Sequence, residues 1–182
     1  MNFDDIKYLE QGNTKQRQVY RLLTKHGIMS ALSGFDPILV GTIPINVDTE
    51  CSDIDIICYA CNLKQFSKTL KELFQRNDGF KLSEYQGQGT NAVVGNFRLE
   101  SFKIEIFGQD VPTRQQIAYR HMLIEHRLLQ QKGGGFRQNV IELKRKGFKT
   151  EPAFALLLDL KGDPYAELLK YDLDMANESP NR

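Results

Sequence analysis

The sequence contains no apolar run near the roughly 20 residues that a membrane-spanning helix needs. Its net charge is only +1, so we expect no bulk attraction to nucleic acid or to an anionic membrane, and any basic site must be local. It also lacks internal repeats and low-complexity stretches. The first residues are acidic where a secretory signal would be basic, and we therefore expect a cytoplasmic protein.

Cysteine is scarce as well. Cys51, Cys58 and Cys61 are too few, and odd in number, for a disulfide framework. Cys58 and Cys61 have the two-residue spacing of redox and zinc motifs, but neither a second pair nor a suitably spaced histidine completes a zinc site. We interpret the cysteines as structural residues and expect Cys58 to be buried.

The hydrophobic pattern predicts one mixed α/β domain, of the α+β kind, with flanking helices and a helical C-terminal third. A helix is expected from its N-cap Thr14 until Gly34 and Asp36-Pro37 stop it, and a second, capped by Asn62, over 63–76. The expected strands are 38–41, 53–59, 80–85, 92–98 and 102–107, with a hairpin connection at 86–89.

Beyond Gly108 the pattern is helical. We expect a helix from Pro112-Thr113 to about Gln130, a break at Gly133–Gly135, and three further helices over about 136–146, from Thr150 and after Gly162. These elements divide the chain into a core of residues 1–111, a helical region of residues 112–173 packed on it, and a flexible tail of residues 174–182.

Two aspartates open the predicted strand 53–59. Residues two apart in a strand point to the same face, so Asp53 and Asp55 should stand side by side. Two like charges ~4 Å apart repel by roughly 4 kcal/mol at an effective dielectric near 20, and carboxylate pairs suit Mg2+. The alternative is a solvated strand edge, which Ile54, Ile56 and Ile57 disfavour because they indicate a buried strand.

A third carboxylate belongs with this pair. The alternation in strand 102–107 places Lys103 and Glu105 on one face and Ile104 and Ile106 on the other. Beside the aspartates, Glu105 would complete a three-carboxylate site for one or two Mg2+ ions, which suits phosphoryl displacement. Taken alone, Glu105 fits a surface-facing acid of a hairpin equally well.

The turn Gly41-Thr42 has a matching role, since glycine lets a phosphate approach the backbone and the threonine hydroxyl can donate to its oxygens. Ten residues separate Thr42 from Asp53, enough for a polar loop that returns to the same end of the sheet. An ordinary turn is the commoner explanation of a Gly-Thr pair by itself.

Val40-Gly41-Thr42, followed after ten residues by Asp53-Ile-Asp55-Ile, resembles the signature of the polymerase-beta-type nucleotidyltransferase superfamily. Thr42 replaces the usual Ser or Gly, and Glu105 matches a third carboxylate that is more often Asp. The resemblance covers about residues 14–108. Over nearly the whole chain, the sequence is also similar to a family of uncharacterised bacterial proteins in that superfamily, a domain of unknown function, in the segments 40–45, 104–109, 118–125 and 149–154.

The resemblance implies a nucleotidyltransferase-like mixed sheet and a Mg2+-dependent transfer of a nucleoside monophosphate from a nucleoside triphosphate to a hydroxyl, with pyrophosphate leaving. The acceptor stays open between a small molecule, a protein and an RNA end. The implied site residues are three catalytic and metal-binding carboxylates and five nucleotide-binding residues: Asp53, Asp55 and Glu105, then Gly41, Thr42, Ser52, Lys103 and Arg120.

The predicted helix 113–130 offers further polar residues. His121 and Glu125 lie one turn apart within its apolar stripe, so we expect them to hydrogen-bond, either as a structural pair or as part of the cleft. Arg120 and Arg127 at the edge of the stripe could reach a triphosphate or form a solvated face. A basic cluster at 144–149 fits the end of a helix, where cations complement the helix dipole, better than a phosphate or RNA contact.

Two other classes of function remain open. A nucleotide-binding or partner-regulating protein, such as an antitoxin-like protein, could keep this fold without turnover, although all three candidate carboxylates are present. An RNA-binding adaptor is disfavoured by the near-neutral charge. The sequence selects neither the nucleotide nor the oligomeric state.

Overall fold

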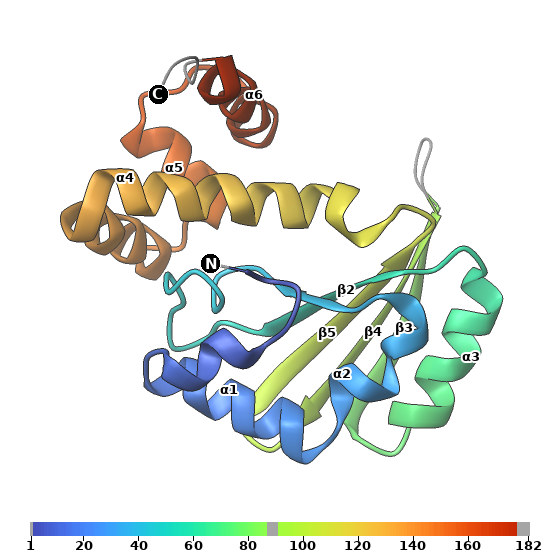
Figure 1. Cartoon of the computed structure of the whole chain (residues 1–182). Coiled ribbons are helices and arrows are strands. Elements are labelled where there is room, and N and C mark those ends of the chain that lie inside the picture. Colours follow the sequence, from blue (N-terminus) through green and yellow to red (C-terminus); the bar gives the residue numbers. More distant parts are fainter. Residues whose placement is uncertain (1, 87–90, 178–182) are drawn as a thin grey trace.

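The computed structural model describes residues 2–86 and 91–177, and a five-stranded mixed sheet forms its centre (Figure 1). The strands lie in the order β1-β2-β5-β4-β3, with β2 and β5 parallel and the other neighbours antiparallel. The predicted mixed sheet is confirmed, and β5 is its central strand. The strands are β1 (Ile38–Val40), β2 (Ile54–Tyr59), β3 (Asp78–Gln86), β4 (Asn91–Leu99) and β5 (Phe102–Gln109).

Helices cover both faces of the sheet. Figure 1 shows α1, α2 and α3 on one side and α4 on the other, with α5 and α6 beyond α4. The α-helices are α1 (Thr14–Lys25), α2 (Ile28–Ala31), α3 (Leu63–Phe74), α4 (Ile117–Arg145), α5 (Thr150–Leu157) and α6 (Pro164–Asn177). Short 3-10 helices are η1 (Lys7–Gln11), η2 (Ser33–Phe35) and η3 (Thr113–Gln115).

The alternation of the strands assigns each face its own core. On the face toward α1 and α3, Ile54, Ile56 and Cys58 of β2 are buried with Ile104 and Ile106 of β5. Cys58 is buried, as its position in the pattern predicts, whereas Cys51 and Cys61 are exposed. The residues of opposite parity face the C-terminal helices, and this is the face that carries the predicted carboxylates.

The single helix predicted to begin at Thr14 and to end before Gly34 is wrong in its second half. Its N-cap is Asn13, which forms a capping box with Gln16. The helix ends at Lys25 because Gly27 adopts a left-handed conformation with φ of 62°, and α2 is a separate turn. An isolated glycine in a helical pattern is easily overlooked as tolerated.

The predicted break at Gly133 is confirmed. Gly133 has φ of 76° and ψ of −167°, so α4 consists of two helical segments that meet at this residue. Its beginning differs from the prediction, because Gln116 is extended and separates the 3-10 turn η3 from the first residue of α4, Ile117. The buried amide of Gln116 donates from Nε2 to the carbonyl of Cys58 at 2.9 Å, which ties this junction to β2.

The far C-terminus is more helical than predicted, since α6 continues to Asn177 where a tail was expected from residue 174. The remainder of that tail lies outside the described residues, as does most of the hairpin connection predicted at 86–89. Within the described part of the chain, no helix is both long and apolar enough to cross a membrane.

The loop between β1 and β2 is held by cations from two helices. Arg137 of α4 donates to the carbonyls of Ile45 and Asn46, and Arg145 pairs with Glu50 at 2.7 Å. Lys15 of α1 donates to the carbonyl of Thr49 and lies 3.5 Å from Asp48. These contacts therefore anchor the middle of the loop, residues 45–50, to α1 and α4.

Candidate active site

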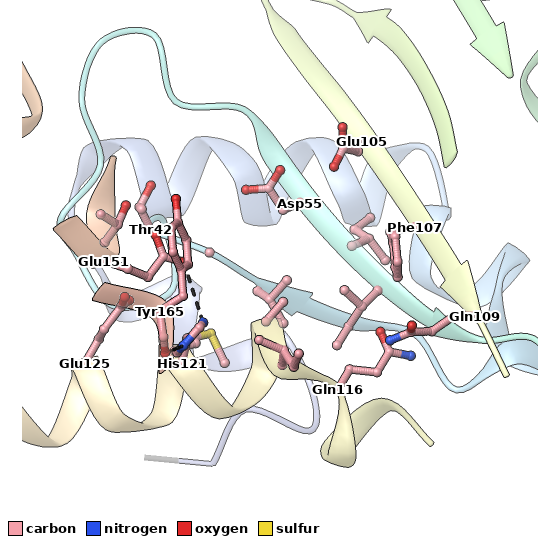
Figure 2. Close-up of a pocket in the computed structure, with 18 residues that line it drawn as sticks. Thr42, Asp55, Glu105, Phe107, Gln109, Gln116, His121, Glu125, Glu151 and Tyr165 are labelled. Atoms are coloured by element: carbon pink, nitrogen blue, oxygen red, sulfur yellow. Dashed lines mark hydrogen bonds and ion pairs between the residues drawn. The ribbon is translucent and has the colours of Figure 1, made fainter. Parts of the chain in front are cut away.

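The register between β2 and β5 places Asp55 directly beside Glu105. Their neighbours Ile54 and Ile104 are also paired and point into the core on the opposite face. Figure 2 shows the two carboxylates on neighbouring strands, above a common cavity. Strand parity and parallel pairing therefore bring together two of the three carboxylates predicted from the sequence.

Burial makes this pair electrostatically unfavourable when both groups are ionised. Desolvation, with the charges of Glu105 and Asp53, raises the pKa of Asp55 to about 7. Desolvation and the charge of Asp53 also raise the pKa of Glu105. A cation at this point would stabilise the ionised forms, and carboxylate oxygens are ligands that Mg2+ accepts.

Asp53 lies one residue before β2 and is more exposed than Asp55. Its Oδ1 is 3.9 Å from Nζ of Lys103 on β5, and 43% and 55% of the two side chains are exposed. The predicted cation Lys103 therefore stands next to the predicted carboxylates, as a loose surface ion pair.

Gly41 makes room for the Asp55 carboxylate. The glycine follows β1 with φ of 79°, a region that other residues enter only with strain. A Cβ at this position would lie 2.5 Å from Oδ2 of Asp55. From the sequence we expect a phosphate to approach the backbone at Gly41. In the structure, the Asp55 carboxylate approaches the space that the missing Cβ leaves free.

Three hydroxyl-bearing residues gather where the β1–β2 loop leaves and rejoins the sheet. Thr42 Oγ1 donates to Ser52 Oγ at 3.3 Å, and the backbone N–H of Thr49 donates to the same Ser52 oxygen at 2.9 Å. The two predicted phosphate-binding side chains, Thr42 and Ser52, are thus in contact although they lie ten positions apart in the sequence.

A cavity of about 500 Å³ lies between the sheet and the C-terminal helices, and Figure 2 shows its lining. We call one part of it the strand end, formed by Gly41, Thr42, Asp55 and Glu105. We call another part the helical end, formed by His121, Glu125, Glu151 and Tyr165 of α4, α5 and α6. The remaining lining residues are Val40, Ile56, Ile57, Phe107, Gln109, Gln116, Ile117, Ala118, Met122 and Thr150.

The predicted site residues divide into two groups. Four of them form the strand end, and the other four do not line the cavity. Ser52 and Asp53 nevertheless contact predicted residues, Thr42 and Lys103 respectively. Arg120 makes no such contact, and Arg127 on the same helix is exposed.

The hydrogen bond predicted between His121 and Glu125 is wrong. His121 Nε2 lies 2.9 Å from the carbonyl oxygen of Tyr165, and its Nδ1 lies 3.7 Å from Oε1 of Glu151. Glu125 is only 3% exposed, and its Oε1 is buried without a hydrogen-bond partner. The partners of His121 come from α5 and α6, which spacing along a single helix does not reveal.

Two lysines of the basic cluster belong to the site electrostatically. Lys144 is partly buried, which lowers its pKa, while the charges of four carboxylates act in the opposite direction: Glu125, Asp48, Glu151 and Asp55. The charges of Lys144 and Lys149 also oppose the upward pKa shift of Asp55. The assignment of the cluster to the end of a helix, where cations complement the helix dipole, did not place either lysine at the site. The only signal in the sequence was that Lys149 directly precedes the predicted helix that begins at Thr150.

The donor chemistry of the strand end fits a hard divalent cation, since it offers carboxylate oxygens from Asp55 and Glu105 with Asp53 nearby. No set of three or more His, Cys, Asp and Glu side chains among residues 2–86 and 91–177 is arranged to hold a metal ion as it stands. The strand end therefore suits a divalent cation by the chemical type and charge of its side chains, and because burial of the ionised Asp55 is unfavourable.

Comparison with solved structures finds other proteins with a similar fold. In all, 48 chains match, among them Cid1, described as having RNA terminal uridylyl transferase activity, with a TM-score of 0.53 and 11% identity over 76% of this chain. Cid1 poly(U) polymerase with MgGTP bound matches with a TM-score of 0.51 at 11% identity over 76% of this chain. The GLD-2/RNP-8 complex matches with a TM-score of 0.52 at 12% identity over 84% of this chain.

The chain spans 45% and 46% of the two Cid1 chains and 61% of the GLD-2/RNP-8 chain. At these identities the likeness concerns the fold alone, which is nucleotidyltransferase-like. No curated protein sequence matches. A family model described as a domain of unknown function, DUF4269, matches residues 21–171, and the chain therefore belongs to that family.

Proposed function

We propose that this protein is a Mg2+-dependent nucleotidyltransferase that moves a nucleoside monophosphate from a nucleoside triphosphate to a hydroxyl group. The observation that carries the proposal is the pairing of Asp55 and Glu105 in register, partly buried with raised pKa values, beside the Gly41-Thr42 turn. The nucleotidyltransferase-like fold and the motif of the sequence support it. The place of the chain in a bacterial branch rests on the motif resemblance alone.

Asp53, Asp55 and Glu105 are the residues that would hold Mg2+. When bound, Mg2+ neutralises charge on the phosphates and on the attacking and leaving oxygens. Holding it here would also relieve the cost of the ionised Asp55 carboxylate, whose pKa lies near 7.

The hydroxyls of Thr42 and Ser52 are placed to donate to the oxygens of the triphosphate. Each is now satisfied mainly within the loop, so binding exchanges one hydrogen bond for another at little cost. Lys144, Lys149 and Lys103 supply positive charge around the same carboxylates and would offset the charge of the phosphates.

In the proposed reaction the hydroxyl oxygen of the acceptor bonds to the α-phosphorus, and the bond from that phosphorus to the bridging oxygen breaks. Pyrophosphate leaves with the electron pair of that bond. Glu105 is the proposed base that takes the hydroxyl proton, because its carboxylate lines the cavity directly beside Asp55.

Fractions of a cell extract can identify the class of molecule that accepts the nucleoside monophosphate. We would incubate the protein and each of four α-labelled nucleoside triphosphates with Mg2+ and the small-molecule, protein and RNA fractions of a cell extract. RNA is included because Cid1 is described as an RNA terminal uridylyl transferase. Label should appear in one fraction with the wild type and with the control Asp110→Asn, an exposed acid just beyond β5, but not with Asp55→Asn.

Equal transfer by wild type and Asp55→Asn would contradict the proposal. Nucleotide binding with no labelled product in any fraction would instead point to the non-catalytic, antitoxin-like alternative.

A further inference from the structure

Hydrogen-bond acceptors outnumber donors at the helical end of the cavity. Glu125 of α4 is 3% exposed, lines the cavity and has a carboxylate oxygen with no partner. Native proteins rarely leave such a group unpaired, because a buried polar atom without a hydrogen bond costs roughly 1–3 kcal/mol. The unpaired oxygen therefore calls for a donor that the protein does not supply.

His121 adds a second acceptor beside it. Its Nε2 lies 2.9 Å from the carbonyl oxygen of Tyr165, which can only accept, so Nε2 carries a proton. In the neutral ring Nδ1 is then an acceptor, and it faces Oε1 of Glu151 at 3.7 Å. Two acceptors stand opposite each other here, at the same end of the cavity as Glu125, and Figure 2 shows the three side chains together.

The nearest cation does not balance this end. Lys144 donates to the hydroxyl of Thr150 at 3.2 Å. Its charge is also shared among four carboxylates, two of them outside the helical end. Burial and the charge of Glu151 raise the pKa of Glu125 well above its ordinary value, and the charge of Lys144 only partly opposes this shift, so the two carboxylates are not ionised together unless a further cation is present.

We propose that the helical end binds the primary ammonium group of a small-molecule acceptor, so that the substrate of the transfer is an amino alcohol. This inference rests on the proposed function for the role of the hydroxyl. An ammonium group has three N–H donors, which match the acceptors on His121, Glu125 and Glu151, and its charge offsets the two carboxylates. The cavity volume of about 500 Å³ is that of a small-molecule site.

Other occupants match less well. The exocyclic amino group of a nucleobase is neutral and has two N–H donors, so it leaves one acceptor unpaired. A metal ion requires its ligands at roughly 2.0–2.6 Å from one point, closer than the roughly 2.7–3.2 Å of a hydrogen bond, and no group of three His, Cys, Asp or Glu side chains in the described part of the chain is arranged for that. An ammonium group satisfies both the charge and the number of acceptors.

The test compares serinol with glycerol, which differ only in carrying an ammonium or a hydroxyl at the central carbon. NMR titration without nucleotide or Mg2+ should show that serinol shifts the His121 ring signals and that glycerol at equal concentration does not. Glu125→Gln and Glu151→Gln should each weaken serinol binding at least tenfold. Glu142→Gln, an exposed glutamate on α4 outside the cavity, is the matched control and should bind like the wild type.

Equal shifts with glycerol, or unchanged serinol binding in both glutamine variants, would overturn the inference. So would loss of binding in Asp55→Asn alone, because the amine would then be held at the strand end. Shifts of His121 by ATP but not by UTP, with no effect of serinol, would assign the acceptors to a nucleobase and also overturn it. Since no nucleotide is present in the serinol titration, its failure leaves the proposed transfer intact, and failure of Mg2+-nucleotide binding leaves the amine site intact.

Discussion

At its strand end the cavity takes its polar groups from the turn after β1 and from β2 and β5, whereas at its helical end it takes them from α4, α5 and α6. The strand end follows from short-range rules, since residues two apart share a face and the register of two parallel strands pairs Asp55 with Glu105. The helical end depends on how three helices pack, and its central contact joins His121 to Tyr165 across 44 residues. The local sequence pattern thus determines where the carboxylates for the proposed transfer lie. The packing of the C-terminal helices determines which polar groups line the other part of the cavity.

The largest expected difference between the two ends concerns catalysis. Glu105→Gln at the strand end should lower the rate of nucleotide transfer by roughly 100-fold or more, in the range seen when a catalytic electrostatic contact is removed. Glu125→Gln at the helical end should instead raise the KM for the acceptor and leave nucleotide binding unchanged. Steady-state kinetics with the acceptor fraction identified above measures the transfer rate and the KM for the acceptor. If Glu105→Gln and Glu125→Gln changed nucleotide binding equally, the two ends of the cavity would not differ in function.

Much of the strand end could be predicted from the sequence, because its rules are local. The alternation of Asp53 and Asp55 with isoleucines gave their face, and the Gly41-Thr42 turn with Ser52 gave the neighbouring loop. The partner of Gly41 could not be predicted, since the approach of Asp55 Oδ2 depends on the pairing of Val40 with Asp55 across β1 and β2.

The helical end was predicted less well for the same reason. Helical spacing placed His121 and Glu125 on one buried face, and both are buried, but it suggested the wrong hydrogen bond. The break of the first helix at Gly27 was missed because a single glycine in a helical pattern is compatible with an uninterrupted helix as well as with the left-handed end that the structure shows. The proximity of Lys144 to the site was missed because it depends on the orientation that the second segment of α4 takes after the break at Gly133.

Gly41→Ala tests the packing of the strand end. Alanine would enter a left-handed conformation and place its Cβ 2.5 Å from Oδ2 of Asp55, so we expect a loss of about 2–4 kcal/mol in the free energy of unfolding. Urea denaturation measures this loss. Gly34→Ala, where a Cβ meets nothing within 4 Å and φ is not positive, is the control.

A double variant separates the two causes of that loss. Asp55→Ala removes the carboxylate, so Gly41→Ala should cost less in this background, with only the backbone strain remaining. An equal cost in both backgrounds would show that the contact with Asp55 contributes nothing.

The pKa of Asp55 predicts a dependence of stability on pH. The folded-state pKa of about 7 is above the ordinary value of 3.8, so the folded state binds more protons between these values and loses stability as pH rises through about 7. Asp55→Asn removes this loss. The advantage of the variant over wild type in the free energy of unfolding, without Mg2+, should therefore grow by roughly 2 kcal/mol between pH 5 and pH 8.

Denaturation curves of both proteins at the two pH values give this difference. A constant difference would mean that Asp55 titrates normally in the folded protein. Repeating the measurement with Mg2+ should reduce the advantage of Asp55→Asn, because the wild type alone would gain stability from the ion.

The smallest effect concerns the basic cluster, where neighbouring lysines provide a matched pair. Lys144→Met should weaken binding of a Mg2+-nucleoside triphosphate roughly tenfold, since its charge lies near Asp55, whereas the exposed Lys146→Met should leave binding unchanged. Fluorescence titration with a labelled nucleotide measures the two affinities. If both substitutions weakened nucleotide binding equally, the cluster would act only through its general positive charge.

Calorimetry of ATP and GTP binding, with and without Mg2+, tests the central claim most directly. The account predicts that Mg2+ strengthens binding of at least one nucleotide by tenfold or more in the wild type and has no such effect in Asp55→Asn. If Mg2+ does not strengthen binding to the wild type, or if Asp55→Asn binds as the wild type does, the paired carboxylates of β2 and β5 are not a metal-nucleotide site.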